Sequence, residues 1–519
     1  MIALLHNAGR LAEHLRRAAE QRSRQPEGAP GWAKKILQSE GLRRSLAGLI
    51  SNSVKENKFS FRLPDSRLIT KKIWAEGCPE FISFAEYQDL EDSDRSLFRV
   101  SFRLSLPDML LHSIVGKTLT KVLEGVLSDG CHGYRPGRGQ PTAVRAVRAL
   151  CENRDAWVVK CDVAQFNETV DHAQLRLILE QIVKPKVDAD CWRILSGTVE
   201  AMLAASAAVN GLPGQSILVG SGLAPALTNL YLSIIDKYLD DQKLRFVRYG
   251  DDLLVACASE NEAKGVLTKL IEMIRSLKQQ PSLKSALGVD ACWGRGLCHR
   301  FDTDEEAVAF EFAHEKAEKL KSDVYSPMDS FDFIGFEFDG PRVLIRQETL
   351  AKAKARIQQY TQRSALIIER AIKRRDFTKG KVIKPPNYYE QSMDTFAVVS
   401  VNYVRDAIRR LNFFLGYKIK KSDAAHRRGR FEFCPGFGFA CSILKCVDSE
   451  DVREQFALLD AYAFRRFRTL MGGMLRNRGP GLKRRYDFTN FDLRSEGLMT
   501  FKDVSNRYVP KGSPGGIAD

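Results

Sequence analysis

The chain has 519 residues, of which 44% are hydrophobic, and its 80 Lys and Arg outnumber its 64 Asp and Glu to give a formal net charge of +16. These values exclude an intrinsically disordered chain, a collagen and a small disulfide-rich scaffold, and the length suffices for about three domains. The eleven cysteines form no CxxC pair, so their spacing resembles neither a disulfide framework nor a zinc ribbon. No apolar run approaches the length of a membrane helix, and we expect a cytoplasmic protein without a membrane partner.

In the first third of the chain, the spacing of apolar residues changes from helical to alternating and back to helical. Apolar residues at helical spacing predict amphipathic helix over residues 1–50, with a polar break at 25–31. Alternation then predicts a strand over 98–106 that ends at Pro107, and a helical period returns over 109–127. The order indicates helical and sheet elements in the same region.

Two apolar stretches further on predict buried strands. One covers 157–163, and the other consists of two arms, 246–249 and 253–256, on either side of a Gly-Asp-Asp turn. A Gly-Asp turn between apolar arms predicts a hairpin, because Gly250 accepts the positive φ that such turns need. Between the two stretches, helical spacing predicts a helix over 221–238 that its first residue, a serine, would cap.

The rest of the chain continues the α+β pattern. A helix is predicted over 262–277, and a pair of strands over 331–338 and 343–345. Long basic helices are predicted over 349–375 and 396–415.

Positive charge concentrates in this last region. The stretch from Arg342 to Arg430 contains 22 Lys or Arg and only 7 Asp or Glu, which accounts for nearly all of the net excess. A field of this kind attracts phosphate backbones or anionic membranes, and its concentration favours nucleic acid.

Three carboxylates are the acidic residues most tightly bracketed by apolar runs: Asp162, Asp251 and Asp252, with Asp332 a weaker case. A charge at the edge of a buried sheet is costly unless something compensates it, and two divalent metal ions would do so. Oxygen-rich sites suit Mg²⁺, with Mn²⁺ as an alternative. An Asp pair alone means little, since the pair at 240–241 only ends a helix, but the combination of strand end and hairpin indicates metal-dependent phosphoryl transfer.

The motifs resemble those of bacterial reverse transcriptases, similar to group II intron and retron enzymes and especially to defence-associated ones. They occur in the family's order between about residues 98 and 345. The matching segments are His132–Gly139, Asp162–His172, Gly220–Leu232, Tyr249–Asp252 and Phe331–Phe336.

The resemblance implies a right-hand polymerase of α+β class, with fingers, palm, thumb and a helical basic C-terminal extension. The implied domains are an N-terminal extension with fingers (1–155), a palm (156–340) that includes a finger segment (about 173–215) and an insertion (about 280–312), a basic helical thumb (341–430), and a C-terminal extension (431–519).

The resemblance also implies roles for single residues. Asp162, Asp251 and Asp252 would be catalytic metal ligands. Lys321 would give a proton to pyrophosphate, although it stands in a lysine-rich segment and can equally be an ordinary surface lysine. Arg103 would hold the triphosphate, against the alternative of ordinary charge at a strand edge.

Further residues would bind nucleic acid or the incoming nucleotide. Two arginines in a Gly/Pro loop and a basic cluster in the thumb would contact phosphates; these are Arg135, Arg138, Lys373, Arg374 and Arg375. The incoming nucleotide would meet Phe166, Asn167, Val219 and Gly220.

The pattern departs from the family around the incoming nucleotide. Asn167 stands where an aromatic ring normally packs under the sugar, and Val219 replaces a glutamine that normally contacts the nucleotide. The segment 211–215 looks like the missing motif but comes five positions early, so it is a substitute finger loop or a coincidence. We therefore expect a DNA product of restricted or repetitive sequence.

The sequence thus predicts an RNA-directed DNA polymerase that uses dNTPs, binds RNA and DNA, and acts in antiphage defence. Its partners would include an associated noncoding RNA, a second reverse transcriptase or another copy of the chain. The alternatives are an RNA-dependent RNA polymerase, suggested by Gly-Asp-Asp, and an inactive palm that binds RNA.

Overall fold

The structure is a computed structural model, and it describes residues 1–23, 31–70, 81–82, 98–163, 166–210, 212–279, 290–293, 297–300, 322–373, 407–419, 431–433, 438–476, 493 and 498–507. The chain divides into two compact units. Unit 1 contains residues 1–334 and 339–341, and unit 2 contains residues 335–338 and 342–519. None of the described helices combines the length and apolar character that crossing a membrane requires.

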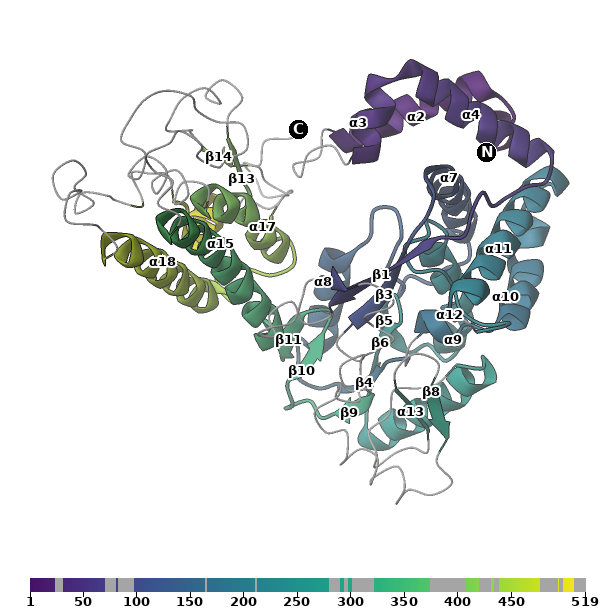
Figure 1. The fold of residues 1–519 in the computed structure, drawn as a ribbon. Coiled ribbons are helices and arrows are strands. Elements are labelled where there is room, and N and C mark those ends of the chain that lie inside the picture. The colour runs from purple at the N-terminus through teal and green to yellow at the C-terminus, as the bar shows by residue number, and fades with distance from the viewer. Residues whose placement is uncertain are drawn as a thin grey trace. The chain divides into compact units, whose positions relative to one another are not determined.

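Unit 1 begins with a group of helices, drawn in purple in Figure 1: α1 (Ile2–Leu5), α2 (Ala8–Ser23), α3 (Gly31–Gln38) and α4 (Glu40–Lys55). Leu11 and Leu15 of α2 are buried, and α2 packs against both α3 and α4. The predicted helical character of residues 1–50 is confirmed in α1 to α4, whereas the predicted break at 25–31 lies outside the described residues except for Gly31, which begins α3.

An antiparallel sheet with the strand order β5-β6-β4-β9 carries the core of unit 1. Its strands are β4 (Trp157–Cys161), β5 (Arg245–Tyr249), β6 (Asp252–Cys257) and β9 (Asp323–Tyr325). Helices α8 (Gln140–Cys151) and α12 (Ala224–Asp241) contact β5, and α13 (Glu260–Ser276) contacts β4, β6 and β9. Because helices cover the sheet, Val159, Leu254 and Val255 are fully buried, and the strands read as continuous apolar runs. The predicted buried strands and hairpin are confirmed, whereas β9 was not predicted.

A smaller antiparallel sheet has the order β2-β1-β3, with β1 (Asp65–Thr70), β2 (Phe81–Ile82) and β3 (Phe98–Arg103). The strand predicted over 98–106 is confirmed only to residue 103, because α7 (Leu106–Leu123) begins before Pro107. Ser105 caps α7 by accepting a hydrogen bond from the Asp108 N–H at 3.3 Å. Proline suits the first turn of a helix, where its missing N–H would have no intrahelical partner, so the prediction that the helix starts at 109 was wrong.

The other elements of unit 1 are α9 (Phe166–Thr169), α10 (His172–Ile178), a π-helical turn (Leu179–Val183), a 3₁₀ turn (Lys184–Lys186), α11 (Ala189–Asn210), β7 (Asp290–Trp293), β8 (Leu297–Arg300) and β10 (Phe331–Phe333). The helix predicted over 221–238 begins at Ala224 instead. Ser221 is therefore not its cap; its Oγ accepts a hydrogen bond from the Leu223 N–H at 3.1 Å in the preceding turn. Pro225 in the first turn of α12 fixes this later start.

Unit 2 is largely helical. Its elements are most of β11 (Phe336–Asp339), β12 (Arg342–Ile345), α15 (Gln347–Lys373), β13 (Tyr417–Ile419), β14 (Phe431–Phe433), α17 (Phe439–Leu444), α18 (Arg453–Arg476) and α19 (Phe501–Arg507). Helices α15 and α18 pack together, and the side-chain amide of Gln455 exchanges two hydrogen bonds of 2.8 Å with the backbone of Ile345. The helix predicted over 349–375 is confirmed as far as Lys373, and the one predicted over 396–415 is helical from residue 407 in the described part.

Candidate active site

The hairpin between β5 and β6 presents two of the three predicted carboxylates. Tyr249 pairs with Asp252 at its end, so Gly250 and Asp251 form the turn, and Gly250 has the left-handed φ of 70° that the turn requires. Asp251 and Asp252 are half-buried. Both carboxylates thus lie at the tip of the hairpin.

The third carboxylate follows the strand next to this hairpin. β4 pairs with β6 up to Cys161 and Leu253, and one more step in this register places Asp162 opposite Asp252. Asp162 is 5% exposed, and its N–H donates to Ser322 Oγ at 3.0 Å. Ser322, which precedes β9, is a positioning residue that no sequence signal indicated.

Carboxylate oxygens are the ligands that Mg²⁺ prefers, so the residue types at this edge suit a magnesium site. In the described part of the chain, no group of three or more His, Cys, Asp or Glu side chains is arranged to hold a metal ion. Lys321 lies outside the described residues, so its predicted role is not tested.

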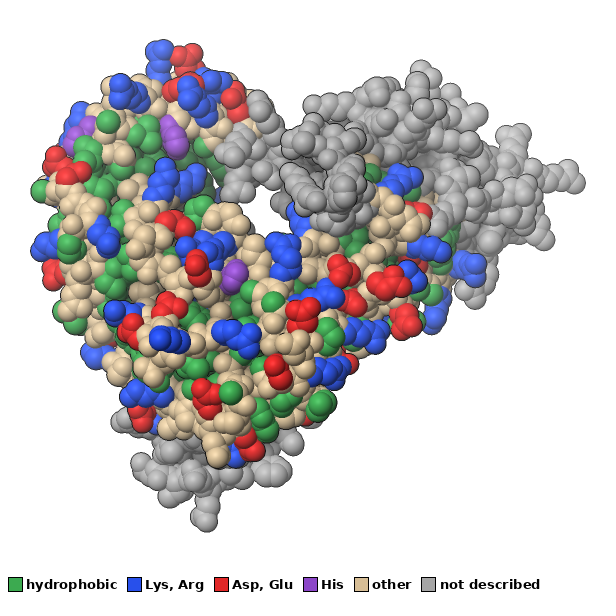
Figure 2. Space-filling model, turned by 180° about the vertical axis from the view of Figure 1, so that it is seen from behind, with side chains coloured by type: hydrophobic (Ala, Val, Ile, Leu, Met, Phe, Trp, Pro, Cys, Tyr) green, Lys and Arg blue, Asp and Glu red, His purple; other side chains and the backbone are tan. Residues whose placement is uncertain are grey.

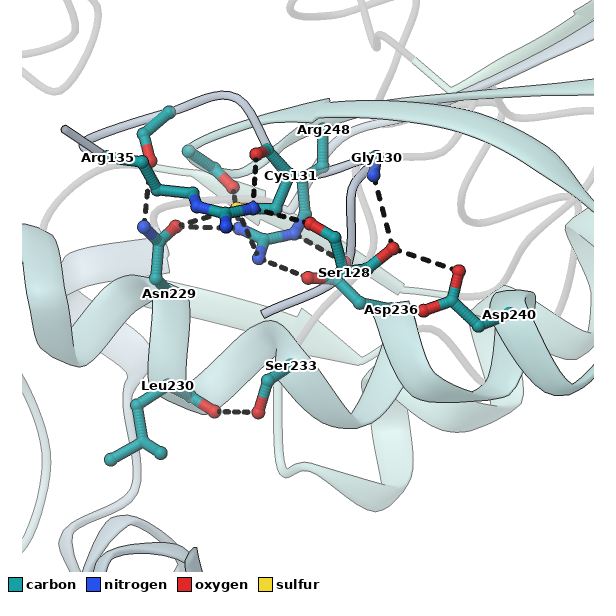
Figure 3. A network of polar contacts seen from close by, with 12 residues as sticks. Ser128, Gly130, Cys131, Arg135, Asn229, Leu230, Ser233, Asp236, Asp240 and Arg248 are labelled. Carbon is teal, nitrogen blue, oxygen red and sulfur yellow. Dashed lines mark hydrogen bonds and ion pairs between the residues drawn. The ribbon is translucent and has the colours of Figure 1, made fainter. Parts of the chain in front are cut away.

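A buried ion pair lies directly below the hairpin (Figure 3). Arg248 donates from Nε to Asp236 Oδ1 at 2.7 Å and from Nη2 to Oδ2 at 2.5 Å, and both side chains are 1% exposed. Arg248 Nη1 also donates to the Gly250 carbonyl at 2.9 Å and to Asn229 Oδ1 at 3.1 Å. Burial alone would lower the pKa of Arg248, but the attraction of Asp236 outweighs it and raises that pKa. A buried cation that sequence reasoning missed therefore binds the backbone of the turn at Gly250 and Asp251.

Arg135 and Arg138, both predicted to contact phosphates, occupy different environments. Arg135 is buried and donates to the Ser128 carbonyl at 2.6 Å (Figure 3). It also pairs with Glu124 at 3.1 Å. Arg138 pairs at 2.5 Å with Asp129, whose side chain is 96% exposed. Arg135 thus stabilises its own loop in this structure, and phosphate contact by either arginine stays a prediction.

The two residues expected under the nucleotide sugar also differ. Phe166 is 2% exposed and packs edge-on against Tyr231, with 6.0 Å between ring centroids. Asn167 is half-buried, and its carbonyl accepts a hydrogen bond from the Ile217 N–H at 2.7 Å. The ring of Phe166 therefore belongs to the core, and its contact with the incoming nucleotide stays a prediction.

The loop at Val219 and Gly220 is attached to the smaller sheet. The Val219 carbonyl accepts a hydrogen bond from the Phe102 N–H at 3.2 Å, and Gly220 has a φ of 98°. A Cβ on Gly220 would lie 2.7 Å from the Phe102 carbonyl oxygen, so this approach requires glycine. Arg103, next along β3, is exposed. The structure thus brings Arg103, Val219 and Gly220 into one neighbourhood.

The segment that looks like the missing motif lies elsewhere. Gln215 forms an antiparallel bridge with Asp171, and the Gly214 carbonyl accepts a hydrogen bond from the His172 N–H at 2.9 Å. This segment therefore packs beside the end of the first catalytic motif.

A buried histidine contacts the residue that follows Val219 and Gly220. His112 Nδ1 is 3.0 Å from Ser221 Oγ, and burial lowers the pKa of His112 to about 4. The imidazole is therefore neutral near pH 7.

The predicted basic cluster is described only at its start. Lys373 is the last residue of α15, and Arg374 and Arg375 lie outside the described residues. On the face drawn in Figure 2, Lys and Arg side chains are mixed with Asp and Glu side chains over the described surface. Phosphate binding by this cluster stays a prediction.

Comparison with known proteins agrees with these motifs. Residues 97–293 match the family model described as reverse transcriptase (RNA-dependent DNA polymerase). The group II intron-encoded protein LtrA of Lactococcus lactis subsp. cremoris is 26% identical over 166 residues, which are 31% of this chain and 27% of that protein. Protein YkfC of Escherichia coli (strain K12) is 27% identical over 143 residues, which are 25% of this chain and 35% of that protein. The chain thus spans about a quarter to a third of the length of these curated relatives.

The matched segment contains Asp162, Asp251 and Asp252 and the strands that carry them. Its antiparallel sheet and covering helices are of α+β type, and the match implies the right-hand polymerase fold. Residues 97–293 of the chain are therefore similar to the reverse transcriptase (RNA-dependent DNA polymerase) family.

Proposed function

We propose that the protein is an RNA-directed DNA polymerase that extends a primer from dNTPs by two-metal nucleotidyl transfer. One observation carries the proposal: β6, which begins at Asp252 directly after the turn with Asp251, pairs with β4, and Asp162 directly follows β4. Two-metal catalysis needs carboxylates from such neighbouring strands.

Asp162, Asp251 and Asp252 would hold two Mg²⁺ ions, or Mn²⁺, because carboxylate oxygens are the ligands that these cations prefer. Bound there, the ions would supply activation of the attacking 3′-hydroxyl and stabilisation of the leaving pyrophosphate. The protein's own part is to hold the ligands in place. Arg248 fixes the carbonyl of the turn and Ser322 fixes the backbone of Asp162.

The surroundings would receive the substrates. Arg103, on the strand attached to Val219, would contact the triphosphate, and Asn167 would lie near the sugar. Lys321 would donate a proton to pyrophosphate. Unit 2, with the basic stretch at 341–430, would act as the thumb that grips the duplex.

We also propose a role in antiphage defence, with a DNA product of restricted or repetitive sequence. The resemblance of the motifs to defence-associated reverse transcriptases supports the first part, and the departures at Asn167 and Val219 support the second. An associated noncoding RNA, a second polymerase or another copy of the chain would complete the complex. Sequencing the nucleic acid that copurifies with the protein, and the DNA made from dNTPs, tests the product and the template together.

The decisive experiment compares Asp251→Asn with Asp241→Asn. Loss of a metal ligand should lower Mg²⁺-dependent incorporation about a thousandfold, whereas the exposed Asp241 at the end of α12 should tolerate the change. Equal thermal melting of both variants controls for folding. Incorporation by Asp251→Asn at the wild-type rate would refute the proposal.

The same assay separates the alternatives. Incorporation of rNTPs in place of dNTPs would identify an RNA-dependent RNA polymerase. Tight RNA binding without incorporation of either would identify an inactive binding module. Phage plating on cells that express the wild type or Asp251→Asn tests the defence role, because protection must disappear with the catalytic aspartate.

A further inference from the structure

Tyr134 is an exposed aromatic residue in an unfavourable backbone conformation. It has a φ of 58°, in the left-handed region that side chains with a Cβ rarely adopt, and it is 51% exposed. Its neighbours Gly133 and Arg135 are both buried. The fold thus holds a bulky ring outward on a loop whose flanking residues face inward.

Contacts with the catalytic hairpin impose this conformation. A Cβ on Gly133 would lie 2.5 Å from the backbone nitrogen of Gly250, so only glycine permits the approach. The Gly133 carbonyl accepts a hydrogen bond from Asn229 Nδ2 at 2.8 Å. The Arg248 carbonyl accepts a hydrogen bond from the His132 N–H at 2.8 Å, and the Arg248 N–H donates to the Gly130 carbonyl at 2.8 Å.

The buried side chains below the loop strengthen the same attachment. Arg248 donates to Asn229, which in turn donates to the loop, and Arg135 donates to the loop's own Ser128 carbonyl (Figure 3). Loop and hairpin therefore move as one piece, and the position of Tyr134 relative to Asp251 is fixed by the fold.

The ring lies beside the turn that carries the catalytic carboxylate. Its centroid is 6.2 Å from that of Tyr249, with 36° between the ring planes. A Cβ on Gly250 would lie 3.5 Å from Tyr134 Cε2. An accessible aromatic surface is thus present within one residue of Asp251.

We propose that Tyr134 stacks against a nucleobase of the terminal base pair at the point of synthesis. The exposed ring next to Asp251 offers an uncharged surface on which a base at the strand end can stack. Every base offers an aromatic face, and stacking on a protein ring is independent of sequence. This inference rests on the proposed function, because it assumes that a primer–template duplex occupies the site.

Two variants separate stacking from a packing role. Tyr134→Phe keeps the ring, whereas Tyr134→Asn removes it and introduces a residue that tolerates positive φ. We expect Tyr134→Asn to raise the Kd for a primer–template duplex about tenfold, and Tyr134→Phe to change it less than about twofold. The melting temperature of Tyr134→Asn should equal or exceed that of the wild type, because the backbone strain is relieved. Unchanged affinity in Tyr134→Asn, or a lower melting temperature, would overturn the proposal.

Fluorescence anisotropy in the presence of EDTA and without dNTPs gives the Kd, so the result does not depend on polymerisation. A failure of the wild type to incorporate dNTPs would count against the proposed function alone. Photocrosslinking then identifies the strand, with 5-iodouracil placed at the primer 3′ end or at the template base opposite. A crosslink to Tyr134 from either position supports the proposal and names the strand, and the absence of a crosslink from both would overturn it.

Discussion

Replacement of Asp236 by alanine should destabilise unit 1 strongly. The change leaves the guanidinium of Arg248 buried at 1% exposure without its carboxylate, and removes both acceptors that lie 2.7 and 2.5 Å from its nitrogens. Removing one partner of a buried ion pair lowers the free energy of unfolding by about 3–5 kcal/mol. The remaining acceptors, which are the Gly250 carbonyl, Asn229 Oδ1 and Cys131 Sγ, do not neutralise the charge.

A matched control lies on the same helix. Asp241 is 4.0 Å from Lys237 in a pair whose side chains are 63% and 80% exposed, and such pairs contribute about 0–1 kcal/mol. Asp241→Ala should therefore be nearly neutral. The double variant Asp236→Ala with Arg248→Met should recover part of the lost stability, because it removes the uncompensated charge.

Urea unfolding followed by tryptophan fluorescence measures this effect in unit 1 alone, because all tryptophans of the chain belong to that unit: Trp32, Trp74, Trp157, Trp192 and Trp293. Incorporation should also fall in Asp236→Ala under conditions where it is folded, since Arg248 holds the carbonyl of the catalytic turn. Equal stability of Asp236→Ala and Asp241→Ala would refute the reasoning.

The remaining predictions concern pH, nucleic-acid binding and nucleotide choice. Burial lowers the pKa of His112 from 6.5 to about 4, so between these pH values His112 is protonated in the unfolded chain and neutral in the folded chain. The free energy of unfolding should therefore fall as pH drops from about 6.5 towards 4, by at most about 1.4 kcal/mol per pH unit. Urea unfolding of His112→Gln should show a smaller loss of stability over this pH range than the wild type. Equal losses in the two proteins would contradict this assignment. The logarithm of the binding constant for nucleic acid should fall linearly with the logarithm of the salt concentration, with a slope of roughly −0.7 to −0.9 per phosphate neutralised. Joint replacement of Lys373, Arg374 and Arg375 by alanine should make this slope shallower. An unchanged slope would place these three residues outside the interface. Asn167→Phe should restore a ring under the sugar, and incorporation assays should then show stronger rejection of rNTPs than in the wild type; unchanged rejection would mean that other groups select the nucleotide.

The carboxylates and their hairpin could be predicted because both depend on local sequence. Gly250 accepts the positive φ that the turn needs, and the apolar arms on either side of the turn form the neighbouring strands β5 and β6 of one buried sheet. The ends of elements were harder to predict, since two signals compete there. Pro107 and Pro225 both lie in the first turn of a helix. The apolar pattern alone suggested that a strand continues up to Pro107 and that a helix starts before Pro225.

Tertiary partners could not be predicted in the same way. Arg248 stands in an apolar strand, and a charge in such a run indicates a buried partner, but nothing in the sequence identifies Asp236 on the preceding helix. Ser322 gave no signal at all, because its contact with Asp162 joins residues 160 positions apart.

The two arginines of the Gly/Pro loop show why residue type alone does not assign a ligand. Both carry the same charge in the same motif, yet the side chain of Arg135 is 5% exposed and that of Arg138 is 28% exposed. A phosphate that approached Arg135 would have to displace backbone carbonyls and Glu124 from a buried guanidinium, which would leave those acceptors unsatisfied. Arg138 is half-buried and donates to both the carboxylate and the backbone carbonyl of Asp129, an exposed residue whose acceptors water can solvate when a phosphate displaces them. Displacing the partners of Arg138 should therefore cost less free energy than displacing those of Arg135, and of the two predicted phosphate contacts the one at Arg138 is favoured.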